Sequence, residues 1–263
     1  MIYELNHYNV VVKDLEKSMA FYQDYLGGKV VFRGLIPPTQ TDVIYLYIAG
    51  GLVELLHRKD PPVDEIFGIT HIAFMSNDLD SDFERLVNAG FEGLVKPKTA
   101  GSGVGRLAFV RGPNGARVEL LQRDVEMRKE VYNHPFVKSF DHISLICNDL
   151  NSSVDFYQNL FGMTSIKSIH DNVSKTNKNY LKYDFDILEL VQSTSKVDGN
   201  DIYAHMAFRV SDVDVALTSA ISKGFKADSA SRVDPIMSGK IGYATDPDGV
   251  KIAFIDRPDL RIN

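Results

Sequence analysis

The sequence of 263 residues contains one cysteine, Cys147, so an internal disulfide is excluded. No apolar run approaches the roughly 18 residues that a membrane-spanning helix needs. There is no run of Lys or Arg, and a net charge of -6 disfavours a phosphate backbone as a partner. A strand pattern begins at Ile2, without a leader-like segment before it. We therefore expect a cytoplasmic protein with no nucleic-acid partner and no membrane span.

Internal repetition is the most prominent feature of the sequence. One pattern occurs four times: a His within an alternating, strand-like stretch is followed seven residues later by an Asp, and a helix-like stretch then ends at a Gly. The Asp is a credible N-cap, and the Gly is a typical left-handed C-cap. The four sets are His7, Asp14 and Gly27; His71, Asp78 and Gly90; His142, Asp149 and Gly162; and His205, Asp212 and Gly224.

Three further strand-like runs follow each helix, so each repeat is predicted to be a βαβββ module. The interval from Asp to Gly is identical in the first and third modules, and it is shorter by one position in both the second and the fourth, which indicates duplication of a pair. We expect modules at residues 3–57, 69–123, 140–193 and 203–258. The corresponding division is a domain at 1–123, a linker at 124–139 and a domain at 140–263. Cys147 lies on the strand face opposite His142, where we expect a buried thiol rather than a nucleophile.

A glutamate recurs at a fixed distance after three of the four histidines. Glu54 lies 47 residues after His7, Glu119 lies 48 after His71, and Glu189 lies 47 after His142, whereas Ala253 stands 48 after His205. Each Glu has apolar neighbours in its strand, and a buried carboxylate must be paired or bound to something. A single strand His is usually a hydrogen-bonded core residue, and a single strand Glu often faces solvent. The recurrence of both residues favours a divalent metal site.

Basic residues at strand ends are candidates for holding an anionic substrate, and Arg33 and Arg106 are the two that we select. Such residues are more often solvated than functional.

These features resemble the vicinal oxygen chelate superfamily, which contains glyoxalase I, methylmalonyl-CoA epimerase, extradiol dioxygenases, and fosfomycin and bleomycin resistance proteins. The resemblance rests on the four His-to-Asp entries, the Phe-Tyr-Gln helices at 21–23 and 156–158, and the segment Pro113–Glu119. It covers almost the full length. It implies an α+β fold in which four tandem βαβββ modules pair into two cupped, mixed β-sheets, each an incomplete barrel around a metal.

The resemblance also implies a ligand set. Glyoxalase-like members use a His (or Gln) and a Glu from each of two modules, which His7, Glu54, His71 and Glu119 match. If modules pair across the two halves instead, the complete set becomes His71, Glu119, His142 and Glu189. Chain contiguity favours pairing within each half. A second or cross-domain site would use His142, Glu189 and His205.

The implied activity is that of a metal-dependent lyase or isomerase of the glyoxalase type, acting on a small vicinal-oxygen substrate through an enediolate. The metal would be Zn, Ni, Co, Mn or Fe, and Glu54 or Glu119 would shuttle the proton. One alternative is a ring-cleaving extradiol dioxygenase using Fe(II) or Mn(II), which Ala253 disfavours in the second half because the dioxygenase Glu would stand there. Another is a non-enzymatic module that binds an antibiotic or other ligand. We expect a monomer or a homodimer.

Overall fold

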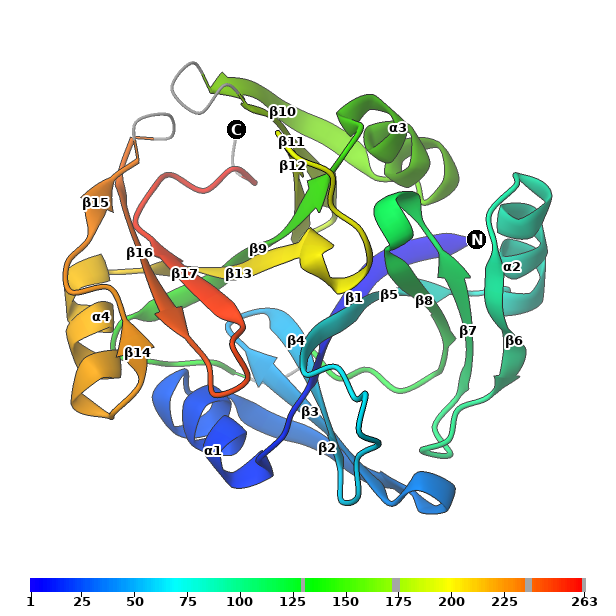
Figure 1. Ribbon diagram of the computed structural model, residues 1–263, viewed down its shortest axis with the longest axis horizontal. Coiled ribbons are helices and arrows are strands. Elements are labelled where there is room, and N and C mark those ends of the chain that lie inside the picture. Colours follow the sequence, from blue (N-terminus) through cyan, green and yellow to red (C-terminus); the bar gives the residue numbers. More distant parts are fainter. Residues whose placement is uncertain (129–130, 172–175, 235–237, 262–263) are drawn as a thin grey trace.

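The computed structural model describes residues 1–128, 131–171, 176–234 and 238–261 (Figure 1). The chain forms two curled, mixed β-sheets, and each is built from two βαβββ modules, so the predicted α+β fold is confirmed. In the first sheet the strand order is β2-β3-β4-β1-β5-β8-β7-β6, and in the second it is β10-β11-β12-β9-β13-β17-β16-β14.

The strands follow the predicted module plan. In the first sheet they are β1 Ile2–Val11, β2 Lys29–Ile36, β3 Thr41–Ile48, β4 Gly51–Arg58, β5 Gly68–Ser76, β6 Gly93–Thr99, β7 Arg106–Arg111 and β8 Arg117–Gln122. In the second they are β9 Val137–Cys147, β10 Thr164–Asp171, β11 Thr176–Tyr183, β12 Asp186–Gln192, β13 Tyr203–Val210, β14 Lys226–Ala227, β15 Arg232–Val233, β16 Lys240–Thr245 and β17 Lys251–Ile255.

Two modules join through their first strands in each sheet. The antiparallel pairs are β1 with β5 and β9 with β13. Within each module the first strand is parallel to the last: β1 to β4, β5 to β8, β9 to β12 and β13 to β17. Modules therefore pair within each half of the chain, as contiguity favoured, and the first and last strands of all four modules lie at the centres of the sheets.

Each module has one helix between its first two strands. They are α1 Leu15–Met19, α2 Leu79–Asn88, α3 Leu150–Asp155 and α4 Val213–Ser222, and the 3-10 turns are η2 Pro37–Thr39, η3 Pro113–Gly115 and η5 Gly199–Ile202. All four predicted N-caps are confirmed: the carboxylates of Asp14, Asp78, Asp149 and Asp212 each accept a hydrogen bond from the backbone N–H three residues on.

The helices of the first and third modules differ from the prediction of one regular helix. Both continue as a π-helix, η1 at Ala20–Tyr25 and η4 at Phe156–Leu160. Each π-helix contains the Phe-Tyr pair of its copy, and both rings of each pair are buried.

The turn between β7 and β8 contains Asn114 and Gly115, whose φ values of 58° and 80° are left-handed. The predicted burial of the thiol at residue 147 is confirmed. Cys147 is a buried free cysteine, and burial raises the pKa of its thiol to about 11. Part of the predicted linker at 124–139 falls outside the described residues.

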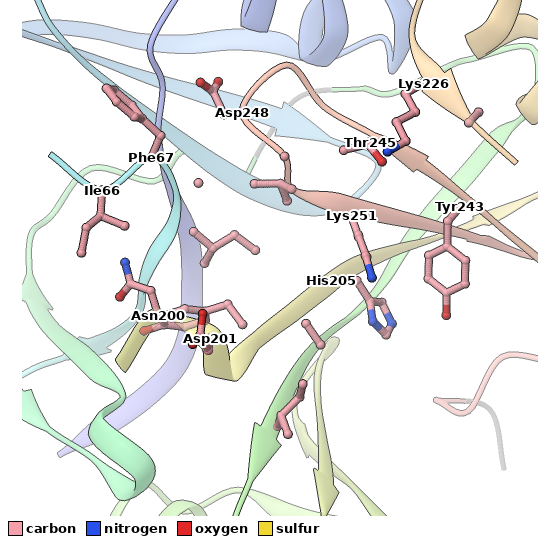
Figure 2. A pocket seen from close by; sticks show the side chains of 18 of the residues that line it. Ile66, Phe67, Asn200, Asp201, His205, Lys226, Tyr243, Thr245, Asp248 and Lys251 are labelled. Atoms are coloured by element: carbon pink, nitrogen blue, oxygen red, sulfur yellow. The ribbon is translucent and has the colours of Figure 1, made fainter. Parts of the chain in front are cut away.

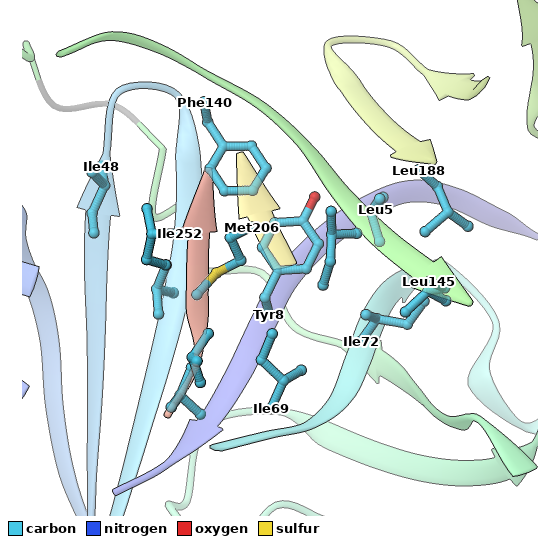
Figure 3. Packing of buried hydrophobic residues seen from close by; sticks show 14 of the residues in the cluster. Leu5, Tyr8, Ile48, Ile69, Ile72, Phe140, Leu145, Leu188, Met206 and Ile252 are labelled. Atoms are coloured by element: carbon cyan, nitrogen blue, oxygen red, sulfur yellow. The ribbon is translucent and has the colours of Figure 1, made fainter. Parts of the chain in front are cut away.

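The two halves share one core. The ring of Tyr8 stacks on that of Phe140 with centroids 4.9 Å apart, and Phe140 meets Phe208 edge-on at 5.1 Å. Figure 3 shows this aromatic stack among aliphatic side chains from strands of both sheets. Residues 124–139 therefore join two sheets that pack on each other, and the predicted division into two domains stays a prediction.

Side chains of the helical segments also form contacts between the two halves. The Tyr22 hydroxyl donates to the Asp246 carboxylate at 2.8 Å, and the Tyr25 hydroxyl donates to the Ala216 carbonyl at 2.8 Å. Correspondingly, the ring of Phe156 packs 4.6 Å from that of Phe91. Figure 1 shows α1 near α4 and α3 near α2 at opposite ends of the molecule. Each half thus buries aromatic rings of the other.

We predict that Phe140→Ala lowers the free energy of unfolding by about 3–5 kcal/mol, because the truncation leaves a cavity between the sheets. Urea denaturation measures the change. The matched control is Phe185→Ala, whose ring is 73% exposed and whose loss should cost less than about 0.5 kcal/mol. Equal effects of the two substitutions would contradict a core shared by both halves.

Candidate metal centre

Four predicted ligand residues converge on one face of the first sheet. They come from its four central strands: Glu54 on β4, His7 on β1, His71 on β5 and Glu119 on β8. The register of the strands brings the four residues together. Asn9 on β1 is paired with both Glu54 and His71 on the two neighbouring strands. Ala73 on β5 is likewise paired with both His7 and Glu119. All four side chains are buried.

The ligand atoms surround a common point. His7 Nε2 lies 3.4 Å from Glu54 Oε2 and 3.3 Å from Glu119 Oε2, and His71 Nε2 lies 3.6 and 3.2 Å from the same two atoms. Two atoms bound to one ion at about 2.1 Å are about 3.0–3.4 Å apart at octahedral and tetrahedral angles. Among the described residues neither His Nε2 makes a hydrogen bond of acceptable geometry, despite its burial. These atoms are aimed at a shared centre, and the residues fit a divalent ion.

Neighbouring side chains fix the orientation of these residues. The Nδ1 of His7 is 3.1 Å from the amide oxygen of Asn6, and Arg123 donates to that oxygen at 2.6 Å. With the proton on Nδ1, Nε2 is left to bind an ion. The amide of Asn9 donates to Glu54 Oε2 at 2.8 Å. The site is therefore held in place by a surrounding shell of polar groups.

Opposite charges compensate within the buried site. Burial by itself lowers the pKa of His7, but the Glu54 and Glu119 carboxylates outweigh it and the pKa is raised. Burial raises the pKa of Glu119, yet its contacts with His7 and His71 reduce it to about 2. The pKa of Glu54 is lowered for the same reason: His7 outweighs the effect of burial. Both carboxylates are thus ionised, as metal ligands must be.

A cavity of about 540 Å³ opens over the site. Glu54, His71 and Glu119 line it, together with aromatic and aliphatic side chains and with further charged ones that include Arg58, Asp64 and Glu65. Arg117 and Arg123 also line it, with guanidinium groups 4.2 Å from the Phe109 ring centre and 5.0 Å from that of Tyr45. A cavity that combines apolar side chains with convergent polar groups is typical of a small-molecule site.

A second cluster lies in the second sheet. His142 Nε2 is 3.3 Å from His205 Nε2 and 3.6 Å from Glu189 Oε2, and His205 Nε2 is 3.9 Å from that oxygen. Ala253 occupies the position that corresponds to Glu119. The structure therefore assembles the two within-half sets and not the set that combines His71 and Glu119 with residues of the other half.

A comparison with known families decides the classification. The model of the Glyoxalase/Bleomycin resistance protein/Dioxygenase superfamily matches residues 4–120 and again residues 139–254. The chain belongs to this superfamily. The resemblance seen in the sequence is thereby confirmed over nearly the whole length.

Members of this glyoxalase superfamily with known names include lactoylglutathione lyases. The lactoylglutathione lyase of Schizosaccharomyces pombe is 25% identical over 305 residues, which cover 97% of each chain. Lactoylglutathione lyase GLX1 of Arabidopsis thaliana is also 25% identical, over 95% of this chain and 90% of its own.

Solved structures of the superfamily agree in fold. The Mn(II)-bound glyoxalase from Novosphingobium aromaticivorans superposes with a TM-score of 0.71 at 16% identity, covering 98% of this chain and 84% of that one. The 2,3-dioxygenase LapB from Pseudomonas sp. KL28 gives the same TM-score and identity, over 97% and 93%. At this identity the likeness establishes the fold alone.

No helix among the described residues is long and apolar enough to cross a membrane. Cytoplasmic location and a monomeric or homodimeric state stay predictions.

Neither of the two arginines that we selected from the sequence is among the residues that line the cavity. Arg106 makes a double hydrogen bond to the Asp80 carboxylate at 2.5 and 2.9 Å, and the exposed Arg33 does not line the cavity either. The sequence interpretation missed Arg117 and Arg123, although strand alternation contains the signal. Arg117 shares a face of β8 with Glu119, two residues before it, and Arg123 continues the same alternation one residue beyond the end of the strand.

The metal-free site should stabilise the protein in a defined pH range. The raised pKa of His7 gives a contribution that is complete below pH 6.5 and is lost as pH rises through the folded-state value. The lowered pKa of Glu119 gives one that is present above pH 4.5 and is lost as pH falls through about 2. Together they are strongest between pH 4.5 and 6.5.

We predict that, after chelator treatment, His7→Gln lowers the free energy of unfolding most at pH 5.5 and progressively less towards pH 9. Urea denaturation at a series of pH values measures the difference. The control is His170→Gln, at an exposed histidine outside both clusters, which should leave the curve unchanged. A loss that does not vary with pH would argue against the ion pairs.

Proposed function

We propose that the protein is a divalent-metal-dependent enzyme of the glyoxalase type, a lyase or isomerase acting on a small substrate with oxygens on neighbouring carbons. The observation that carries the proposal is the convergence of His7, Glu54, His71 and Glu119 at 3.2–3.6 Å. Two neutral imidazoles and two carboxylates balance the charge of a divalent ion. The lactoylglutathione lyases at 25% identity support the same reaction type.

A divalent ion bound by these residues supplies Lewis acidity, which stabilises negative charge that develops on the substrate oxygens. The protein positions the substrate in the 540 Å³ cavity and limits the access of water. Its remaining task is to move a proton between two adjacent carbons. A carboxylate removes the proton from one carbon, and the same carboxyl group returns it to the next, so no other reactant is consumed.

The two carboxylates differ in their surroundings, and this difference favours Glu119 as the base. Glu54 Oε2 is held by the Asn9 amide at 2.8 Å, and Asn9 is in turn held by the Thr70 hydroxyl at 2.5 Å. The described ion pairs of Glu119 are with His7 and His71 alone. When those imidazoles bind an ion, Glu119 is the less restrained carboxylate. We assign proton transfer to Glu119 and a fixed ligand role to Glu54.

We predict that Glu119→Gln lowers kcat by about 10²–10⁴-fold, because an amide accepts no proton from carbon at neutral pH. The assay follows turnover of lactoylglutathione, the compound that the names of the relatives give. Glu84→Gln, at an exposed glutamate of α2, is the matched control and should retain full activity. Full activity in Glu119→Gln would transfer the role to Glu54.

We also predict that crystals soaked in Mn²⁺ give an anomalous scattering peak about 2.0–2.3 Å from ligand atoms of the four residues. His71→Ala should abolish or strongly weaken this peak, because it removes one of two nitrogen ligands. His57→Ala, at a histidine outside the cluster, should leave it intact. A wild-type crystal without a peak at this position would remove the proposed mechanism.

A ring-cleaving dioxygenase using Fe(II) or Mn(II) is the second candidate. The observation in its favour is that His7, His71 and Glu119 by themselves form a two-histidine, one-carboxylate cluster within 4.8 Å. That activity needs Glu54 to leave coordination positions open for oxygen, although Glu54 is the better anchored carboxylate. Oxygen uptake with catechols distinguishes the two enzymes. Tight binding of an aromatic drug without metal would instead favour a non-enzymatic binding protein.

A further inference from the structure

We propose that Tyr203, the first residue of β13 in the second half, is a positioning residue for the metal centre of the first half. It acts through Thr70 and Asn9, and we call these three residues the relay. The inference deepens the proposed function and rests on it, because it concerns the ion that the first cluster binds under that proposal. Three observations carry it: the contacts of the Tyr203 hydroxyl, the direction of the hydrogen bonds beyond it, and the residues at the equivalent positions of the second half.

The Tyr203 hydroxyl lies between the two strands that carry His71 and Glu119. Its oxygen is 3.2 Å from the Thr70 carbonyl of β5 and 3.2 Å from the Arg117 carbonyl of β8. It also accepts a hydrogen bond from the Arg117 N–H at 3.3 Å. The parallel pairing of β5 and β8 begins further along both strands. The hydroxyl therefore joins the two strands just ahead of their own ladder.

Burial keeps this hydroxyl protonated. The Tyr203 ring packs against the main hydrophobic core, and burial raises the pKa of its hydroxyl. A tyrosine hydroxyl donates one hydrogen bond and accepts others. This capacity matches the carbonyl acceptors and the N–H donor that surround it.

Thr70 connects the Tyr203 contact to the ligand residues. The Asn9 amide nitrogen donates to Glu54, and the Asn9 amide oxygen accepts a hydrogen bond from the Thr70 hydroxyl at 2.5 Å. Because the Thr70 hydroxyl has given its one proton to Asn9, its oxygen can only accept from His71 Nδ1, which is 3.3 Å away. The proton of this imidazole then lies on Nδ1, and Nε2 is left to bind an ion.

Tyr203 also bears on the spacing of two ligands. The shortest approach between a histidine and a glutamate of the first cluster is the 3.2 Å from His71 Nε2 to Glu119 Oε2. His71 directly follows Thr70, and Glu119 lies two residues after Arg117. The strands that the hydroxyl joins are therefore those that bring this pair together. Groups behind the ligands orient them for the ion in this way.

The second half has different residues at the equivalent positions. Counted from the histidine of each strand, the replacements are Ala204 for Thr70, Ser144 for Asn9 and Ile69 for Tyr203. Alanine and isoleucine have no hydroxyl, and Ser144 Oγ is buried without a hydrogen-bond partner among the described residues. The relay is therefore a property of the first site and not of the βαβββ module in general.

The segment in front of Tyr203 packs on the first half. A side chain at Gly115, in the turn between β7 and β8, would come within 2.4 Å of the carboxylate of Asp198, which directly precedes η5. Asn200 of η5 and Ile66 of the connector before β5 line both the 540 Å³ cavity and a pocket of about 850 Å³ in the second half. Figure 2 shows these two residues on one side of that pocket. Tyr203 thus follows a segment that forms part of the wall of the first cavity.

Equilibrium dialysis of chelator-stripped protein against Mn²⁺ tests the inference, and the binding that His71→Ala abolishes defines the first site. We expect Tyr203→Phe, which removes only the hydroxyl, to raise the Kd of this site about tenfold, as loss of a group behind a metal ligand does. The matched control is Tyr25→Phe, whose hydroxyl also donates to a carbonyl of the other half, at 2.8 Å. It should lower stability in urea to a similar extent and leave the Kd unchanged.

Thr70→Val interrupts the relay one step nearer the ligands and nearly preserves the shape of the side chain. We expect it to raise the Kd about tenfold or more, whereas Thr70→Ser, which keeps the hydroxyl, should bind Mn²⁺ within about twofold of the wild type. Circular dichroism checks the fold of every variant. An unchanged Kd in Thr70→Val overturns the relay even if Tyr203→Phe does not fold.

The remaining outcomes separate this inference from the proposed function. A Kd in Tyr203→Phe within about twofold of the wild-type value overturns the positioning role and leaves the metal centre intact. Equal weakening in Tyr203→Phe and Tyr25→Phe assigns the effect to packing of the halves and also overturns it. A wild type without Mn²⁺ binding that His71→Ala abolishes removes the proposed function together with the inference.

Discussion

Burial of two carboxylates and two imidazoles at one point of a β-sheet is the constraint on which the first site depends. An isolated buried charge costs several kcal/mol, so each of these groups must be compensated by its neighbours or by an ion. The compensation requires the charged atoms to lie in direct contact, which in turn requires strands in fixed register. The order β4-β1-β5-β8 supplies that register, because the antiparallel pair β1 and β5 is flanked on each side by a parallel strand that carries a glutamate.

Gene duplication explains why the sequence could predict which residues form this cluster. A ligand on the first strand and one on the last strand of a module keep a nearly constant spacing, so the recurrence of that spacing predicts His7, Glu54, His71 and Glu119 together. The same approach could have predicted that Arg117 lines the cavity, since it lies two residues before Glu119 in one strand and therefore on the same face. The pairing of Arg106 with Asp80 could not be predicted in this way, because it joins a strand to the start of a helix distant in the sequence.

Other features depend on contacts that no periodicity encodes. The Phe-Tyr-Gln helices read as regular helices, yet both contain a π segment whose adjacent aromatic rings are buried against different neighbours. Tyr22, in the first module, donates to Asp246 in the fourth, and burial raises the pKa of that carboxyl to about 6. Such pairings arise from how the two sheets pack on each other, and local sequence patterns do not predict this packing.

The packing of the two halves also affects the first cluster of histidines and glutamates. Arg128, on the connecting segment, donates at 2.7 Å to the buried Asp186 of the second sheet and also to the backbone carbonyls of Leu5 and Asn6. Asn6 adjoins His7 and orients its ring. Removal of one partner from a buried pair leaves an uncompensated charge, so the strand that carries His7 is held against the second sheet by a contact that is costly to break. The second half therefore helps to set the geometry of the first site, whatever the second half binds itself.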